Sequence, residues 1–210
     1  MVGPTLLNPS YSYKAIVMRS VEFGESDLIV TFLLSNGEKK TFKARGAKNS
    51  KKRFSGGVLE IGNYIMFRTS KSKYSENYEL AEASLLKDFT GIRQSYDRIE
   101  AMYNSLQVAE FTTQDGLEAT ELFHLVGNFL TELNKVKDPT ALFIKFLTRL
   151  LWVHGVLPEQ SLLTKYGRQS LQQQQEISKK EQKEIKYELR NAYENAFGLN
   201  KTLKDFFSTY

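Results

Sequence analysis

A run of lysines and arginines between residues 39 and 53 is the part of the sequence whose residue types and spacing suggest a chemistry. These fifteen consecutive positions hold eight basic residues and no aspartate or glutamate. The eight are Lys39, Lys40, Lys43, Arg45, Lys48, Lys51, Lys52 and Arg53. So many cations without a counter-charge create a concentrated positive field, which predicts an anionic partner.

Aromatic residues accompany this basic run, and a second basic and aromatic group follows it. The additional candidates are Phe42, Phe54, Lys71, Lys73 and Tyr74. Single-stranded nucleic acid is held by a positive groove that follows the phosphate backbone and by aromatic faces on which bases stack. We therefore predict the main nucleic-acid contact in residues 38–54, with the second group contributing. The alternative is that the lysines only aid solubility and that Phe42 and Phe54 are core residues.

The sequence holds no recognisable set of catalytic or metal-binding residues. It has no cysteine, no GxxxxGK[ST] loop and no GxGxxG motif, which argues against thiol chemistry, thiolate zinc and nucleotide hydrolysis. His124 is interpreted as structural, and so is His154, at a helix end where the dipole favours a protonated ring. Glu25 and Asp27 are interpreted as turn residues. We expect no enzymatic activity, no cofactor and no bound metal.

The first part of the chain has the period of β-strands. The predicted strands are 13–23, 28–34, 39–45, 58–69 and 78–85. Asn36-Gly37 predicts a tight hairpin between the second and third strands, and alternation in the third lets Phe42 and Ala44 face a core. A basic loop, residues 46–57, follows. Five short strands are compatible with a barrel of the OB type, and strand count alone also permits an SH3-like barrel.

After residue 87 the apolar spacing becomes helical. Three stripes consist of Ile92, Tyr96, Ile99, Tyr103 and Leu106, then Leu122, Val126, Phe129 and Leu133, then Phe143, Phe146, Leu147 and Leu150. Asp138 and Pro139 open the third helix, and Gly155 with Pro158 closes it.

Two more helices are predicted towards the C-terminus. Ser178 and Glu181 form a capping box that opens a helix running to about residue 197, where Gly198 stops it. Residues 200–207 predict a last short helix. The predicted fold class is α+β, with an OB-like β-barrel in residues 1–85 and an all-helical domain in residues 86–210.

Charge is distributed unevenly between these two predicted domains. Residues 1–85 hold 13 Lys and Arg against 8 Asp and Glu, whereas residues 86–210 hold 16 of each sign. The net charge of +5 therefore belongs to the first domain. Residues 1–12 lack the pattern of a signal peptide, and no apolar stretch reaches the about 18 residues that a membrane span needs. We expect a cytoplasmic protein with no membrane partner.

Several segments together resemble one known family. They are YKAIVMR at 13–19, FGESDLIVT at 23–31, ARGAK at 44–48, SKKR at 50–53 and, more loosely, GVLP at 155–158. They resemble the RecO family of bacterial recombination mediators, with its apolar first strand, GE-x-D turn, A-[KR]-G-[AV]-[KR] segment and basic loop.

The resemblance implies an OB-fold domain, a helical domain and a role in DNA repair. Family members bind single- and double-stranded DNA and anneal complementary strands. With RecR they load the recombinase onto DNA coated with single-stranded-DNA-binding protein, which implies a cytoplasmic, nucleoid-associated protein. Many members carry a four-cysteine zinc site after the G-x-x-P segment, and residues 159–167 depart from this pattern because they hold no cysteine.

The family also recognises the acidic, apolar-ended C-terminal tail of single-stranded-DNA-binding protein in its helical domain. Lys145 and Arg149, one turn apart, are candidates for a basic rim that would hold it, and the alternative is a solvated helix face. A competing function for the whole chain is an RNA-binding OB protein of translation or ribosome assembly, which stacking and phosphate contacts alone do not separate from a DNA-binding one. A metal-dependent nuclease lacks the ligands it would need.

Overall fold

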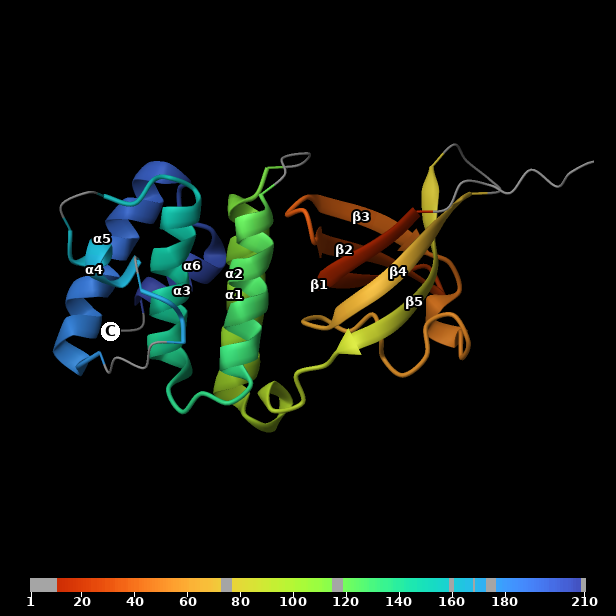
Figure 1. The fold of residues 1–210 in the computed structure, drawn as a ribbon, viewed down its shortest axis with the longest axis horizontal. Coiled ribbons are helices and arrows are strands. Elements are labelled where there is room, and N and C mark those ends of the chain that lie inside the picture. Colours follow the sequence, from red (N-terminus) through yellow and green to blue (C-terminus); the bar gives the residue numbers. More distant parts are fainter. Residues whose placement is uncertain are drawn as a thin grey trace, which may run out of the picture. The chain divides into compact units, whose positions relative to one another are not determined.

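The structure, a computed structural model, describes residues 11–72, 77–114, 119–158, 161–167, 169–172 and 177–208. It divides the chain into two compact units. The first contains all five strands and ends at Asp88, and the second runs from Phe89 and also includes Asn36–Glu38. Strands precede helices along the chain (Figure 1), which confirms the predicted α+β class.

The β unit is one antiparallel sheet whose two edges come together. Its strands are β1 (Tyr11–Phe23), β2 (Asp27–Leu34), β3 (Lys39–Ala44), β4 (Tyr64–Lys71) and β5 (Tyr78–Lys87). Their order in the sheet is β3-β2-β1-β4-β5, so β3 and β5 are the edge strands. Just after β3, Arg45 Nε donates to both carboxylate oxygens of Glu79 on β5, at 2.8 and 2.7 Å. A sheet in this order, curled until its edges approach, is compatible with the OB type.

The inward face of this curled sheet is aromatic and aliphatic. Phe32 and Phe67 stack with their ring centroids 4.5 Å apart and are almost fully buried. Phe42 and Tyr13 pack against them and are half-buried. The alternation predicted for the third strand is therefore confirmed at Phe42 and Ala44, which both join this core.

The fourth strand begins later than the sequence predicts. The segment 58–63 consists of turns, in which Val58 and Leu59 are buried although they are not in a strand. Gly62 has a φ of 87°, which ends any extended run there because this left-handed region favours glycine. Asn63 is buried and donates its side-chain amide to the backbone of Gly57 at 3.0 Å. Val58 and Leu59 thus fill the core from a loop.

The helical unit is built around one central helix. Its elements are η2 (Ile92–Gln94), α1 (Tyr96–Thr112), α2 (Thr120–Leu133), α3 (Pro139–Val153), α4 (Leu162–Gly167), α5 (Lys179–Ala196) and α6 (Lys201–Ser208). Helix α3 contacts α1, α2, α4 and α5, and Phe143 and Phe146 of α3 pack on Phe129 of α2. None of the helices in the described residues is both long and apolar enough to cross a bilayer.

Both predicted caps of these helices are confirmed. The Asp138 carboxylate accepts from the backbone N–H of Ala141 at 3.0 Å at the start of α3. Ser178 and Glu181 form the reciprocal capping box of α5. The apolar stripes predicted for α2 and α3 are buried as well.

The stripe predicted for the first helix is confirmed at Ile92 and Leu106, which are buried, and wrong at its two tyrosines, and α4 was not predicted. Tyr96 is 77% exposed and Tyr103 is 40% exposed. Helix α1 instead buries a face of mostly small residues: Ala101, Met102, Ser105, Leu106, Val108, Ala109 and Thr112. Small side chains let helices approach closely. The spacing of large apolar residues does not predict a buried face of this kind. Helix α4 spans only 6 residues, too few for a periodic signal.

Candidate nucleic-acid interface

The basic loop, residues 46–57, is held to the β1–β2 turn at its beginning. The backbone N–H of Gly46 donates to Asp27 Oδ1 at 2.8 Å, and that of Lys48 donates to the carbonyl of Ser26 at 3.0 Å. Gly46 has a φ of 61°, which lets the chain turn sharply out of β3. A short 3-10 helix, η1 (Ala47–Asn49), follows. The loop therefore leaves the barrel in a defined direction.

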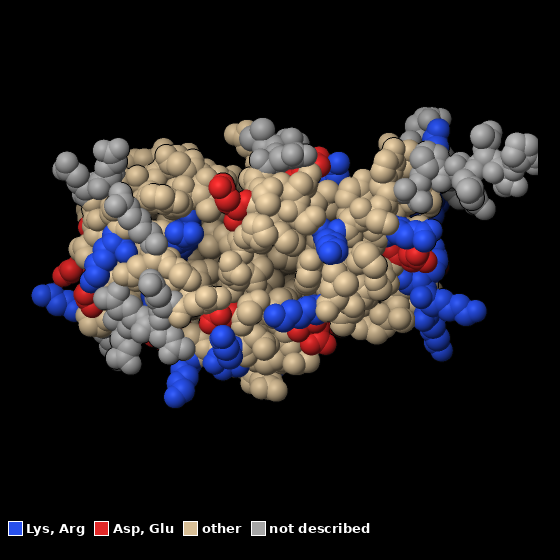
Figure 2. Space-filling view, in the orientation of Figure 1, with Lys and Arg blue, Asp and Glu red and all other residues tan. Residues whose placement is uncertain are grey.

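A second set of contacts holds the loop along the free edge of β5. The backbone N–H of Ala83 on β5 donates to the carbonyl of Arg53 at 3.0 Å. The Arg53 guanidinium donates to the carbonyl of Arg45 at 2.8 Å, and Ser50 Oγ accepts from the Arg53 backbone N–H at 3.2 Å. The exposed residues 51–53 are thus carried on a fixed backbone. Figure 2 shows Lys and Arg side chains projecting from the β unit where this loop, orange in Figure 1, lies.

Carboxylates of the β unit face Lys43, Arg45 and Lys48. Lys43 Nζ lies 2.8 Å from Asp27, Arg45 pairs with Glu79, and Lys48 Nζ lies 2.9 Å from Glu22, which is 72% exposed. The hydrogen bond from Lys43, followed by that from the Gly46 N–H, lowers the pKa of Asp27. The Arg45 guanidinium, with help from Ser72, lowers the pKa of Glu79. The positive charge that these three residues offer a ligand is partly neutralised.

Lys51, Lys52 and Arg53 have the charge most open to a ligand. All three side chains are exposed, and none forms an ion pair with a carboxylate in the part of the chain that the structure describes. Lys39, Lys40 and Lys71 are half-buried on β3 and β4. A cation that forms no ion pair with a carboxylate binds a phosphate more strongly, because no ion pair has to be broken first. The centre of the predicted site is therefore its 51–53 segment.

The aromatic part of the predicted site differs from expectation. Phe54 is only 6% exposed and belongs to the barrel core, so its ring is not free to stack on a base, and Arg53 lies 5.2 Å from the ring centroid. Phe42 is half-buried in the same core. The predicted residues Lys73 and Tyr74 lie outside the described residues.

Sequence reasoning missed the aromatic residues that are exposed on the β unit. Phe23, at the end of β1, is 53% exposed, with Lys43 Nζ 4.5 Å from its ring centroid. Tyr11 is 50% exposed and packs edge-to-face on Tyr78 at 5.3 Å. Their positions at the two ends of β1 are the only feature of the sequence that indicates their exposure. Strand alternation alone does not distinguish an exposed strand end from a buried one.

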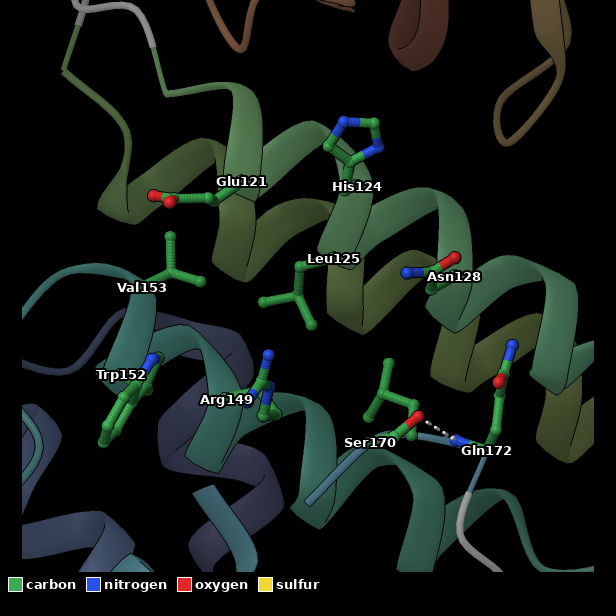
Figure 3. A pocket seen from close by; sticks show the side chains of 10 residues that line it. Glu121, His124, Leu125, Asn128, Arg149, Trp152, Val153, Ser170 and Gln172 are labelled. Carbon is green, nitrogen blue, oxygen red and sulfur yellow. Dashed lines mark hydrogen bonds between the residues drawn. The ribbon is translucent and has the colours of Figure 1, made fainter. Parts of the chain in front are cut away.

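In the helical unit, Lys145 and Arg149 do not form a shared exposed rim. Lys145 is only 6% exposed, and burial lowers its pKa. Arg149 lines a cleft of about 390 Å³ between α2 and α3, together with Leu125 and Trp152. Figure 3 shows Leu125 directed from α2 towards α3, where Arg149 lies, with Trp152 farther along α3. The Arg149 guanidinium also donates to the carbonyl of Gly167 at 2.8 Å, which holds it at the cleft.

The two histidines lie in different surroundings in the helical unit. His124 is exposed on α2 at the same cleft. His154 lies 3.2 Å from Thr112 Oγ1 and packs on Phe197, and burial lowers its pKa. Burial therefore opposes the effect that the helix dipole was expected to have on this ring. Within the described ranges no three His, Asp or Glu side chains come close enough together to hold a metal ion.

The topology and the basic surface together define an OB-like protein with a helical second unit. A small OB-like barrel carries a fixed, basic loop across the gap between its edge strands, and an all-helical unit follows. Residues 9–89 match the family model described as "Recombination protein O N terminal".

Relatives named DNA repair protein RecO match this chain over a longer part of the sequence than the barrel. The chain is 28% identical over 152 residues to DNA repair protein RecO of Anaeromyxobacter dehalogenans and 29% identical over 143 residues to that of Chloroherpeton thalassium. It is 31% identical over 149 residues to that of Myxococcus xanthus. These matches cover 72%, 68% and 70% of the chain and 59%, 55% and 60% of the relatives. Residues 9–89 thus match the N-terminal domain of the RecO family, and the chain resembles RecO proteins beyond it while spanning less than two thirds of the length of these relatives.

Proposed function

We propose that this chain is a DNA repair protein that mediates recombination by binding single- and double-stranded DNA, without being an enzyme. The observation that carries the proposal is the fixed basic loop, where Lys51, Lys52 and Arg53 project without carboxylate partners among the described residues. Each phosphate that such a residue neutralises releases condensed counterions, which favours binding to any sequence. The names of the relatives support DNA as the polyanion.

The finer activities proposed are strand annealing and, with RecR, loading of the recombinase onto DNA coated with single-stranded-DNA-binding protein. Sequence-independent contacts to phosphate suit annealing, because the bases stay available for pairing. For the acidic tail of single-stranded-DNA-binding protein we propose the α2–α3 cleft. Its apolar residues and Arg149 supply the two features that an acidic, apolar-ended peptide requires.

The test of DNA binding is a salt titration of affinity, measured by fluorescence anisotropy on a labelled single strand. Affinity should fall with log salt at a slope of about −0.7 per phosphate contact. Changing Lys48, Lys51, Lys52 and Arg53 together to Ala should weaken binding to every sequence and flatten the slope by up to about 3. The same variant should anneal complementary strands more slowly, both on plain DNA and on precoated DNA.

A matched control removes the same charge from the helical unit. The control variant changes Lys180, Lys183, Lys201 and Lys204, all exposed on α5 and α6, to Ala. It should leave the slope nearly unchanged. An unchanged slope and affinity in the loop variant would refute the assignment of the loop, and tighter binding to RNA than to DNA of the same sequence would favour the translation alternative.

A further inference from the structure

A groove of about 260 Å³ lies beside the basic loop, on the outward face of β4 and β5. Strand register sets its floor, because Met66 pairs with Ser84 and Arg68 pairs with Glu82, and residues directly opposite each other share a face. Phe67, between Met66 and Arg68 on the strand, points into the core and is 1% exposed. The floor residues therefore face solvent.

The loop supplies the other wall of this groove. Lys52 and Arg53 line it, and the Ala83–Arg53 backbone hydrogen bond fixes them next to β5. Three of the charged lining residues are cations, Lys52, Arg53 and Arg68, against one carboxylate, Glu82. The groove is thus a positively charged continuation of the loop surface onto the sheet.

The single carboxylate of the groove, Glu82, forms a weak ion pair with Arg68. Arg68 Nη1 lies 3.4 Å from Glu82 Oε1, and the two side chains are 56% and 55% exposed. Exposed pairs of this kind contribute about 0–1 kcal/mol. A guanidinium has five N–H donors, so an arriving phosphate can be bound by Arg68 without first breaking a strong ion pair.

We propose that this groove is a second nucleic-acid subsite, in which Arg68 and the loop cations bind backbone phosphate and Met66 contacts the sugar or base. Small-molecule sites usually occupy about 300–1,000 Å³, so a smaller, open groove suits a short stretch of a polymer better than a whole small ligand. Continuity with Lys52 and Arg53 makes that polymer the one that the loop binds. The inference rests on the proposed function and extends the path of the strand from the loop onto β4 and β5.

Neutralising Glu82 and neutralising Arg68 should change the affinity for nucleic acid in opposite directions, which tests the proposal. The Glu82 carboxylate repels a phosphate in the groove and occupies one face of Arg68, so its neutralisation favours binding. Arg68→Gln should weaken binding of a labelled single strand about five- to tenfold, as for one charge-assisted hydrogen bond, and flatten the salt slope by about 0.7. Glu82→Gln should instead tighten binding about two- to fivefold.

Two further variants control for charge and for folding. Arg190→Gln removes one exposed arginine from α5 and should not change affinity. Arg68→Lys keeps the charge and should retain the salt slope while losing part of the affinity, because an ammonium does not bind phosphate through two parallel hydrogen bonds. Thermal unfolding of the full chain should be unchanged in all variants, since these side chains are exposed.

The outcomes separate this groove from the function of the loop. If Arg68→Gln and Glu82→Gln bind like the unmodified protein while the fourfold loop variant is impaired, the groove proposal is overturned and DNA binding by the loop stands. If the loop variant is also unimpaired, the proposed function fails as well. An oligoglutamate of equal charge that binds as tightly as DNA, with the same sensitivity to Arg68→Gln, would identify an acidic peptide as the occupant and overturn the proposal.

Discussion

Asp27 and Glu79 each form an ion pair with a basic residue of the β unit and so reduce the positive charge that it offers a ligand. Asp27 holds both Lys43 and the first N–H of the basic loop, and Glu79 accepts from Arg45 and, at 2.8 Å, from Ser72. The sequence predicts where positive charge gathers, but it does not predict which cations are paired. Arg45 and Glu79 are 34 positions apart, and only the closing of the sheet brings them together.

Glu79→Gln should lower the free energy of unfolding at neutral pH by about 1–2 kcal/mol, because the charged acceptor that Arg45 and Ser72 both donate to is lost. Since Arg45 and Ser72 lower the folded-state pKa of Glu79 below its usual 4.5, this stabilisation is fully present above pH 4.5 and is lost as the pH falls through the folded-state pKa. Denaturant unfolding at several pH values should show the two proteins converging in acid.

The control is Glu25→Gln, which changes an exposed carboxylate in the β1–β2 turn. It should shift stability by less than about 0.5 kcal/mol at neutral pH. A stability difference for Glu79→Gln that stayed constant down to the lowest pH would mean that ionisation of Glu79 does not stabilise the barrel.

Elements with strong local signals are the ones that the sequence predicts well. The Asn36-Gly37 turn, the Asp138 cap and the Ser178–Glu181 box are each decided by a few neighbouring residues, and the structure has all three. The start of β4 is decided by the left-handed turn at Gly62, and the buried face of α1 by packing against other parts of its unit. A periodic pattern in the sequence therefore assigns them incorrectly.

Ser178→Ala should reduce stability by about 1 kcal/mol, because Ser178 Oγ accepts from the backbone N–H of Glu181 and no other group of the box replaces it. The opening turn of α5 should lose most protection in hydrogen exchange. Lys180→Ala, one residue before Glu181 and exposed, should change stability by less than about 0.5 kcal/mol. Equal losses in both variants would show that the capping hydrogen bond contributes nothing particular.

The whole molecule separates two kinds of surface between its units. The β unit has the excess positive charge, whereas residues 86–210 balance 16 basic against 16 acidic residues. The helical unit offers instead a half-apolar cleft with Arg149 and Trp152, the latter 44% exposed. Segment composition predicts the first surface. The second depends on how the helices pack around α3, where Arg149 lines the cleft and Lys145, one turn away, is buried.

Arg149→Gln should weaken binding of an acidic peptide with an apolar C-terminal residue about tenfold, through loss of one charge-assisted contact, and leave DNA affinity unchanged. The fourfold loop variant should show the reverse. Isothermal titration with the peptide and anisotropy with DNA measure both on the full chain. Arg149→Lys, which keeps a cationic donor near the Gly167 carbonyl, controls for loosening of α4. Parallel losses of peptide and DNA binding in either variant would contradict two separate surfaces.

The hydrogen bond between Ala83 and Arg53 has a consequence for the behaviour of the protein in concentrated solution. An edge strand with unpaired N–H groups is a template on which another chain can add a strand, and proteins commonly cover such edges with a loop. Arg53 supplies this cover on β5, and the positive charges of Lys51 and Lys52 repel a second copy that approaches the same edge. We therefore expect the loop, besides attracting a polyanion, to disfavour self-association of the β unit through the β5 edge.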